Sequence, residues 1–302
     1  MPGHKFHNRV AVITGAGRGL GREYALLLAS KGARIVVNDP GSAIKGDGVD
    51  AGPAEAVVQE IRAAGGEAVA CLESVATPEG GAAIIQAALD AFGRIDILIH
   101  NAGNVRYGSL EEIPHEDFKA VVDVHLMGAF NVVRAAFPIM AEAGYGRVVL
   151  TSSIGGLYGT NNVVNYGVSK AGIIGLNNVV AIEGAPKGIL SNIILPGAVT
   201  RMAEGLDTSM YPPMGADLVA PVVGWLAHES CTVTGEMFVS MAGRVARALI
   251  AETEGVYRPS WSIDDVANEI DAIRDTDRLW LLPSVSGYMD HLQRSFEMAS
   301  KG

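Results

Sequence analysis

The chain has 302 residues, of which 49% are hydrophobic and 19% are charged, so it carries ample apolar material for a buried core. Its formal net charge of −10 argues against a surface that holds a phosphate backbone, and no nucleic-acid partner is expected. Two cysteines, Cys71 and Cys231, suit buried thiols better than a disulfide framework. No secretory signal is recognisable, and the apolar stretch 163–182 contains Lys170, so no membrane span is expected. These features predict a cytoplasmic protein.

Short runs rich in β-branched residues alternate with longer helical patterns along the chain. Strands are predicted at residues 9–14, 33–38, 67–72, 95–100, 146–152, 190–195 and 236–239. Helices are predicted between them, at residues 20–30, 54–64, 79–92, 116–143, 166–185 and 218–227. This alternation predicts an α/β fold of the Rossmann type, with a doubly wound parallel sheet of about seven strands and helices on both faces.

Two segments fall outside this alternation. Residues 40–52 contain four glycines and two aspartates after the second strand and are predicted to form a surface loop. Residues 244–302 contain Trp261, Trp280 and helical patterns, and are predicted to form a helical C-terminal extension of the domain at 1–243. Its aromatic residues either close the core or pack across a subunit interface.

A glycine-rich loop follows the first strand and precedes a helical pattern, in the context that phosphate-binding loops require. Glycine lets the backbone approach a pyrophosphate, and the helix N-terminus offers free N–H groups to it. The residues predicted to bind a dinucleotide here are Gly15, Arg18, Gly19, Leu20 and Gly21.

Asp39 ends the second strand, where a carboxylate accepts hydrogen bonds from ribose hydroxyls and repels a 2′-phosphate. Arg18 could instead meet a 2′-phosphate, but no second positive charge stands beside Asp39. NAD is therefore favoured over NADP as the cofactor.

Tyr166 and Lys170 are four residues apart in a helical pattern, and Ser153 follows a predicted strand end. The Lys170 ammonium is expected to lower the pKa of Tyr166, so that the tyrosine can take or return the proton of a substrate hydroxyl. Ser153 would hold the reacting oxygen by a hydrogen bond. No metal site is indicated by the spacing of the histidines.

The glycine loop, the triplet Asn101-Ala102-Gly103, Ser153 and the Tyr166-x-x-x-Lys170 pair together resemble the short-chain dehydrogenase family, over about residues 9–243. The resemblance implies a nicotinamide-dependent enzyme that forms a homodimer through its long helices. It further implies that the cofactor is lined by Asn101, Ala102, Gly103, Tyr166, Lys170, Pro196, Gly197, Val199 and Thr200.

Further stretches, among them Val37-Asn38-Asp39 and Gly156-Leu157-Tyr158-Gly159, are similar to the dehydrogenase unit of peroxisomal multifunctional enzyme type 2, a (3R)-hydroxyacyl-CoA dehydrogenase. In that subgroup Ser74 and Val75 would lie beside the adenine. Because the chain ends in Ser-Lys-Gly and not in Ser-Lys-Leu, a free-standing version is expected.

Two histidines depart from the family pattern. His125 stands where the family usually has a catalytic Asn, and His100 replaces the first Asn of an Asn-Asn-Ala-Gly stretch. His125 is either a catalytic proton-relay residue or a hydrogen-bonded helix residue. His100 is expected to pack under the sheet edge.

The predicted function is oxidation of the 3-hydroxyl of a hydroxyacyl-CoA in lipid metabolism, with a 17β-hydroxysteroid or another secondary alcohol as the alternative substrate. Four arginines are candidates for coenzyme A phosphates: Arg106, Arg201, Arg244 and Arg247. A different class of function, a non-catalytic NAD sensor, stays open, although the intact Ser153, Tyr166 and Lys170 argue against it.

Overall fold

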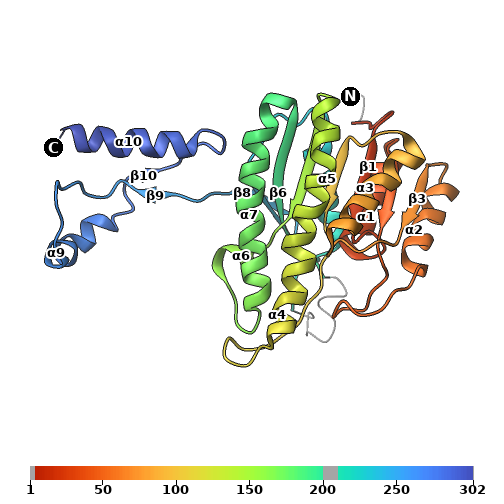
Figure 1. Ribbon diagram of the computed structural model, residues 1–302, viewed down its shortest axis with the longest axis horizontal. Helices are drawn as coiled ribbons and strands as arrows, with labels where there is room; N and C mark the ends of the chain where they lie inside the picture. The colour runs from red at the N-terminus through yellow and green to blue at the C-terminus, as the bar shows by residue number, and fades with distance from the viewer. Residues whose placement is uncertain (1–3, 200–209, 302) are drawn as a thin grey trace. The chain divides into compact units, whose positions relative to one another are not determined.

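The computed structural model describes residues 4–199 and 210–301, and it is built around one large sheet (Figure 1). Eight strands form the sheet in the order β3-β2-β1-β4-β5-β6-β7-β8. Their bounds are β1 Val10–Thr14, β2 Arg34–Asn38, β3 Ala68–Cys71, β4 Ile97–His100, β5 Gly146–Thr151, β6 Ile189–Gly197, β7 Met237–Met241 and β8 Arg244–Ala248. All neighbouring strands from β3 to β7 run parallel, which confirms the Rossmann-type sheet predicted from the sequence.

Two groups of helices cover the sheet, because each connection between parallel strands must return along a face. In the first group, α5 (Gly128–Glu142) packs between α3 (Pro78–Phe92) and α7 (Val164–Gly184), and Figure 1 shows α5 and α7 side by side. In the second group, α1 (Gly19–Ser30) packs against α2 (Gly52–Ala63) and α8 (Ala220–Ala227). Shorter helical segments are α4 His115–Val122, η1 Asp123–Met127, α6 Ile154–Tyr158, η2 Ala185–Lys187 and η4 Ala216–Leu218.

The strand register brings the carboxyl ends of the central strands level with one another. Thr14 of β1 lies opposite Asn38 of β2 on one side and opposite His100 of β4 on the other. β1 and β4 are neighbours although β2 and β3 separate them in sequence, so the strand order reverses here. Such a switch point is where open α/β sheets bind ligands, and the loops after these strands converge on it.

Buried apolar residues of β1 fix the position of the carboxyl edge of the sheet. Val10, Ala11, Val12 and Ile13 of β1 have no exposed surface, and Ala11 and Ile13 belong to a core cluster with buried residues of neighbouring strands and helices. Full burial of a Val or Ile side chain contributes roughly 1.5–3 kcal/mol. The glycine loop therefore starts from a rigid strand.

The sequence did not predict strand β8. Ala242 and Gly243 both have positive φ, 48° and 78°, as the two central residues of a type I′ hairpin turn require. The chain therefore turns back after β7 and adds β8 to the edge of the sheet.

The single helix predicted at 116–143 is a continuous run of three pieces, in which the π-helical turn η1 separates α4 from α5. The run His115–Glu142 is the one described helix that is long and apolar enough to cross a membrane, by length and composition only. It packs against α3 and α7, and this packing accounts for its apolar side chains.

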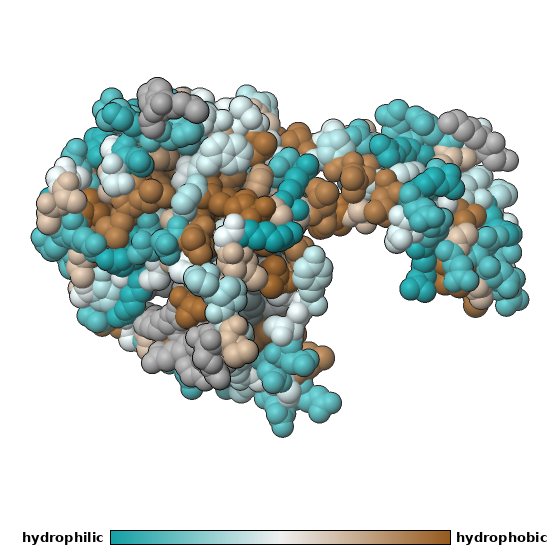
Figure 2. All heavy atoms as spheres, turned by 180° about the vertical axis from the view of Figure 1, so that it is seen from behind, coloured by the Kyte–Doolittle hydropathy of each residue, from teal (hydrophilic) through white to brown (hydrophobic). Residues whose placement is uncertain are grey.

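The chain divides into two compact units, Met1–Arg247 and Ala248–Gly302. The second unit contains a two-stranded sheet and two helices, with bounds β9 Glu252–Thr253, α9 Ile263–Ile273, β10 Leu279–Trp280 and α10 Gly287–Lys301. Ser262 and Asp265 form a capping box at the start of α9. Between residues 248 and 300 no side chain is fully buried, and Figure 2 shows apolar side chains at the surface of this unit.

Candidate active site

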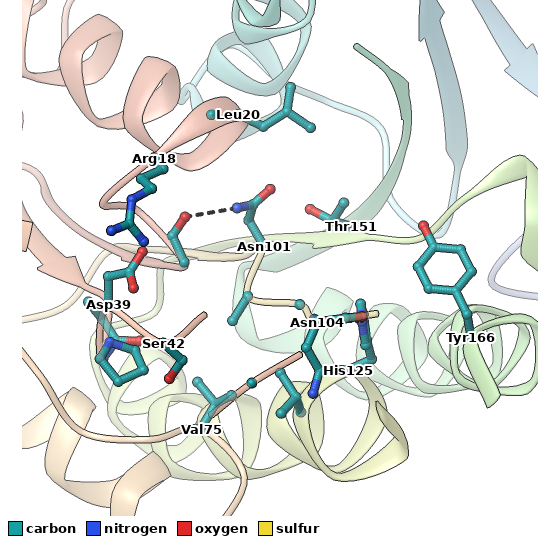
Figure 3. A pocket seen from close by; sticks show the side chains of 18 of the residues that line it. Arg18, Leu20, Asp39, Ser42, Val75, Asn101, Asn104, His125, Thr151 and Tyr166 are labelled. Carbon is teal, nitrogen blue, oxygen red and sulfur yellow. Dashed lines mark hydrogen bonds between the residues drawn. The ribbon is translucent and has the colours of Figure 1, made fainter. Parts of the chain in front are cut away.

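A cavity of ≈ 300 Å³ opens at the carboxyl edge of the sheet. Most of its lining comes from the ends of six strands and the segments after them, as the switch point predicts, and the rest comes from η1 and α7. Arg18 and Asp39 lie at one end of the cavity, whereas His125 and Tyr166 lie at the other (Figure 3). The site therefore has a glycine-loop end and a tyrosine end, joined by the Asn101–Asn104 turn after β4.

The glycine loop fits closely against the turn after β4. Gly15 has a φ of 63°, and a Cβ at this position would lie 2.7 Å from the Cα of Ala102. A Cβ on Gly21 would lie 2.2 Å from the backbone oxygen of Gly15. The Asn101 side chain donates to that same oxygen at 3.1 Å (Figure 3). Only glycine at these positions lets the backbone line the cavity.

The N-terminus of α1 points a set of free N–H groups at the cavity. Arg18 is the N-cap residue and makes no side-chain capping bond, and the first turn holds no acidic residue. The first N–H groups of a helix have no intrahelical partner and carry a partial positive charge. Since Arg18, Gly19 and Leu20 line the cavity, this end fits the pyrophosphate of a dinucleotide.

Asp39 stands at the end of β2 and braces the glycine loop. One carboxylate oxygen accepts from the N–H of Gly17 at 2.9 Å and the other from the N–H of Gly41 at 2.7 Å. Each oxygen keeps a lone pair for a further donor. Within the described ranges, the Arg18 guanidinium forms an ion pair with the carboxylate of Asp50, at 4.0 Å.

The loop after β2 is part of the site, although the sequence placed it only as a surface loop. Ser42, Ala43 and Gly46 line the cavity. The loop is held by the N–H of Val105, which donates to the Ile44 carbonyl at 3.1 Å, and by Arg106. Composition alone could not show this, because the contacts join segments about sixty residues apart in sequence.

Arg106 holds that loop in place by hydrogen bonds. Its guanidinium donates to the Lys45 carbonyl at 3.0 Å, to Asp47 at 3.1 Å and to Asp117 at 2.6 Å. Because these three partners occupy its guanidinium, Arg106 does not fit the predicted role of binding coenzyme A phosphates. Arg247 likewise pairs with Glu236 at 3.2 Å. Arg244 is exposed on β8, and Arg201 lies outside the described residues.

Tyr166 and Lys170 lie on the first turns of α7, and both line the cavity. The Lys170 Nζ lies 5.5 Å from the centre of the Tyr166 ring and donates to the Thr151 carbonyl at 2.6 Å. Ser153 is the N-cap of α6, and its Oγ accepts from the N–H of Gly155 at 3.1 Å. A Cβ on Gly155 would lie 3.5 Å from both this Oγ and the ring of Tyr166, so the structure brings the predicted catalytic trio together.

The charges of this trio differ from the prediction. Burial raises the pKa of Tyr166, and its hydrogen bond with Ser153 opposes that rise. Burial lowers the pKa of Lys170 to about 7. The expected lowering of the tyrosine pKa by Lys170 is therefore absent here: the hydrogen bond from Ser153 is the group that lowers it, and desolvation is the larger effect.

His125 lies in the π-helical turn and forms a wall of the tyrosine end. Its ring packs edge-on against the Tyr166 ring, with centroids 5.3 Å apart. Its Nε2 lies 2.8 Å from the carbonyl oxygen of Asn104, and its Nδ1 is buried without a hydrogen-bond partner in the described structure. Burial and the nearby Lys170 lower the pKa of His125 well below its usual range, so the ring is neutral. His100 is the last residue of the central strand β4 and is fully buried at the carboxyl edge of the sheet.

Most residues predicted to bind a cofactor line the cavity: Gly15, Arg18, Gly19, Leu20, Asp39, Ser74, Val75, Asn101, Ala102, Gly103, Tyr166, Lys170 and Pro196. Gly21, Gly197 and Val199 do not, because Gly21 packs under the loop, Gly197 packs against Met241, and Val199 donates its N–H to Met214 at 2.7 Å. Thr200 lies outside the described residues.

The sequence also missed lining residues: Asn38, Pro40, Ser42, Ala43, Gly46, Asn104, Val124, Thr151, Ser152 and Ala198. Several adjoin residues that were predicted, so the rule that ligands sit at strand ends could have found Asn38, Asn104 and Thr151. Within the described ranges, no group of three or more His, Cys, Asp and Glu could hold a metal ion.

Comparisons with known proteins bear on this geometry. The family model for short chain dehydrogenases matches residues 9–210. Over 263 residues the chain is 49% identical to peroxisomal multifunctional enzyme type 2 of Drosophila melanogaster, covering 86% of this chain and 43% of that protein. The chain thus spans less than half the length of this relative.

Two solved structures are similar to the chain. One is full-length peroxisomal multifunctional enzyme type 2 from Drosophila melanogaster, with a TM-score of 0.79 and 38% identity over 97% of this chain and 50% of that one. The other is a short chain dehydrogenase from Mycobacterium avium, with a TM-score of 0.78 and 37% identity over 88% of this chain and 94% of that one. These findings confirm the resemblance predicted from the sequence.

One prediction is wrong by the same comparisons. Relatives from Drosophila melanogaster, Dictyostelium discoideum and Saccharomyces cerevisiae are named as peroxisomal enzymes. The expected cytoplasmic location rested on the absence of a recognisable targeting segment, and this finding overturns it.

Proposed function

The chain belongs to the short-chain dehydrogenase family, and we propose that it is an NAD-dependent dehydrogenase that oxidises the 3-hydroxyl of a (3R)-hydroxyacyl-CoA to the ketone. The family's dehydrogenases are enzymes that use nicotinamide cofactors. One observation carries the proposal: Tyr166, Lys170 and a glycine-loop helix N-terminus line the same cavity. The identity to a multifunctional enzyme favours the thioester substrate.

Tyr166 acts as the general base in this proposal. In oxidation Tyr166 acts as the phenolate: the hydroxyl proton passes to its oxygen as the substrate C–O bond becomes a carbonyl, and the hydride leaves the same carbon for the cofactor, so that atoms and electrons balance. NAD, when bound, supplies the hydride acceptor. Ser153 holds the reacting oxygen, and its place beside the Tyr166 ring supports this role. Lys170 joins α7 to the end of β5 through its hydrogen bond to the Thr151 carbonyl.

The glycine-loop end would hold the cofactor. The N–H groups at the start of α1 would bind the pyrophosphate, and Asp39 would accept from the adenosine ribose. Asp39 also supports NAD over NADP, because its carboxylate repels a 2′-phosphate. Arg18 also lies at this end of the cavity, and its guanidinium faces the Asp50 carboxylate across 4.0 Å.

His125 is assigned a packing role and not a charged relay. A neutral, fully desolvated ring whose Nε2 faces the backbone of Asn104 is suited to holding the Tyr166 ring in place. Of the alternatives raised by the sequence, neither steroid oxidation nor a non-catalytic sensor is favoured by the comparisons.

We further propose a homodimer formed through the outer faces of α5 and α7. Apolar side chains on these faces are 41–53% exposed: Phe130, Val168, Val179 and Ile182. Single exposed apolar residues are normal, but a row along two adjacent helices indicates an interface. Sedimentation at several concentrations tests this assembly.

The test of the function follows NADH absorbance with purified protein, NAD or NADP, and three substrates: a (3R)-hydroxyacyl-CoA, its (3S) epimer and a 17β-hydroxysteroid. Turnover confined to the (3R) thioester with NAD supports the proposal. Turnover of the steroid alone, or none at all, contradicts it. Tyr166→Phe keeps the ring but removes the base, and it should lower kcat by at least about 100-fold while NAD still binds.

A further inference from the structure

His100 is a buried titratable residue that the proposed reaction does not use. It ends β4, has no exposed surface, and has a hydrogen-bond partner at each ring nitrogen. Nδ1 lies 3.0 Å from the hydroxyl oxygen of Thr14, and Nε2 lies 3.1 Å from the backbone oxygen of His125. The ring thus stands between the strand that carries the glycine loop and the π-helical turn beside Tyr166.

The hydrogen-bond partners of Thr14 determine which nitrogen carries the proton. The Thr14 hydroxyl accepts from the N–H groups of Asn101 and Ala102, each at 3.1 Å, so both of its lone pairs are occupied. Its own hydrogen can therefore only be donated, and His100 Nδ1 is the acceptor within reach. A neutral ring that accepts at Nδ1 carries its hydrogen on Nε2. His100 consequently donates this hydrogen to the His125 carbonyl.

The carbonyl that receives this bond belongs to the residue that packs on Tyr166. The His125 ring fills the space beside Gly103, where a Cβ would lie 2.5 Å from its Cε1. Its other side meets the Tyr166 ring, at an angle of 84° between the planes. A shift of the His125 backbone therefore moves the ring against which the Tyr166 ring packs.

We propose that His100 is a positioning residue: by bridging Thr14 and the His125 carbonyl, it fixes the π-helical turn and, through the His125 ring, the orientation of Tyr166. This inference rests on the proposed function, since Tyr166 is the base only in that reaction. It gives the two histidines a joint role, because one holds the backbone of the other.

Two substitutions separate the two bonds of the bridge. His100→Gln places an amide nitrogen near the position of Nε2 and keeps a donor for the His125 carbonyl. His100→Asn reaches only to the position of Nδ1, so it keeps an acceptor for Thr14 and loses the bond to His125. Both bury an amide in the same place, so their general effect on folding is matched, and thermal unfolding of both checks this.

The experiment compares kcat and KM of the two variants with the (3R) thioester. A lost hydrogen bond that matters in the transition state should lower kcat of His100→Asn by about five- to tenfold. KM should change by less than about twofold, because the bond touches no substrate. His100→Gln should keep kcat within about twofold of the wild type. Wild-type kcat in both variants, or an equal fall in both, overturns the proposal.

A second readout does not depend on turnover. With ¹³Cζ-tyrosine labelling, and the Tyr166 signal assigned from Tyr166→Phe, His100→Asn should move that signal and His100→Gln should leave it in place. If the wild type oxidises none of the three substrates, the proposed function fails, and this spectrum still decides whether His100 positions Tyr166. An unmoved signal in His100→Asn refutes the role of His100 even in an active enzyme.

Discussion

The buried Lys170 should make the stability of the protein depend on pH in a defined direction. Burial lowers its pKa from 10.5 to about 7 in the folded chain. Between these values the unfolded chain binds more protons than the folded one, so the free energy of unfolding rises with pH from about 7 to about 10.5. Above that window both states are neutral at this site. Below it both are charged, and the folded state bears the whole desolvation penalty, at most about 5 kcal/mol.

Urea unfolding of the wild type and of Lys170→Met measures this effect. The slope from one lysine is about 1.4 kcal/mol per pH unit, so from about pH 7.5 to about pH 9.5 the wild type should gain roughly 2 to 3 kcal/mol relative to the variant. Met keeps most of the apolar stem and removes the titrating group. Lys187→Met, on the exposed surface, controls for the loss of a positive charge. Parallel stability curves for the wild type and Lys170→Met would refute the reasoning.

Three further predictions concern the glycine loop, the loop over the cavity and the C-terminal unit. Gly21→Ala places a Cβ 2.2 Å from a backbone oxygen and should abolish NAD binding, whereas Gly224→Ala, with one flexible side chain at 3.3 Å, should bind NAD normally in a fluorescence titration. Arg106→Gln removes the ion pair of 3.1 Å with Asp47 of the loop, together with the one of 2.6 Å with Asp117, and should raise the NAD dissociation constant about two- to fivefold; equal affinity would show that the loop does not depend on these ion pairs. Removal of residues 248–302 should reduce turnover or dimerisation, measured by the NADH assay and sedimentation, and an active dimer without them would contradict this.

The strands and the glycine-loop end of the site were predictable because their signals are local. A β-branched run followed by glycines encodes both a buried strand and a close turn within about a dozen residues. Gly15 and Asp39 could thus be placed at strand ends, and the register of β1 with β2 then brings those ends together. Tyr166 and Lys170 are likewise joined by one helix.

The remaining features depend on contacts between distant segments. The loop at 40–52 lines the cavity only because Arg106 and Val105 hold it. The π-helical turn at His125 is not visible in a pattern that reads as one helix, since a π turn has no strong sequence signature. Sequence spacing likewise shows that Lys170 lies close to Tyr166 but not how deeply it is buried, and this burial is what lowers its pKa.

Buried polar groups at the two edges of the sheet differ in what surrounds them. At the amino edge, Asp96 is 1% exposed and its carboxylate is bound by Arg9, by Arg94 and by the N–H of Val10, so that its charge is fully paired. At the carboxyl edge, cavity-lining residues keep buried polar atoms without a partner in the described structure: Asn104 Oδ1, His125 Nδ1 and Thr151 Oγ1. Buried polar atoms usually have a hydrogen-bond partner, so unpaired ones in the wall of a cavity are groups that a bound ligand can satisfy. Their place beside Tyr166 supports the carboxyl edge as the edge that binds and reacts.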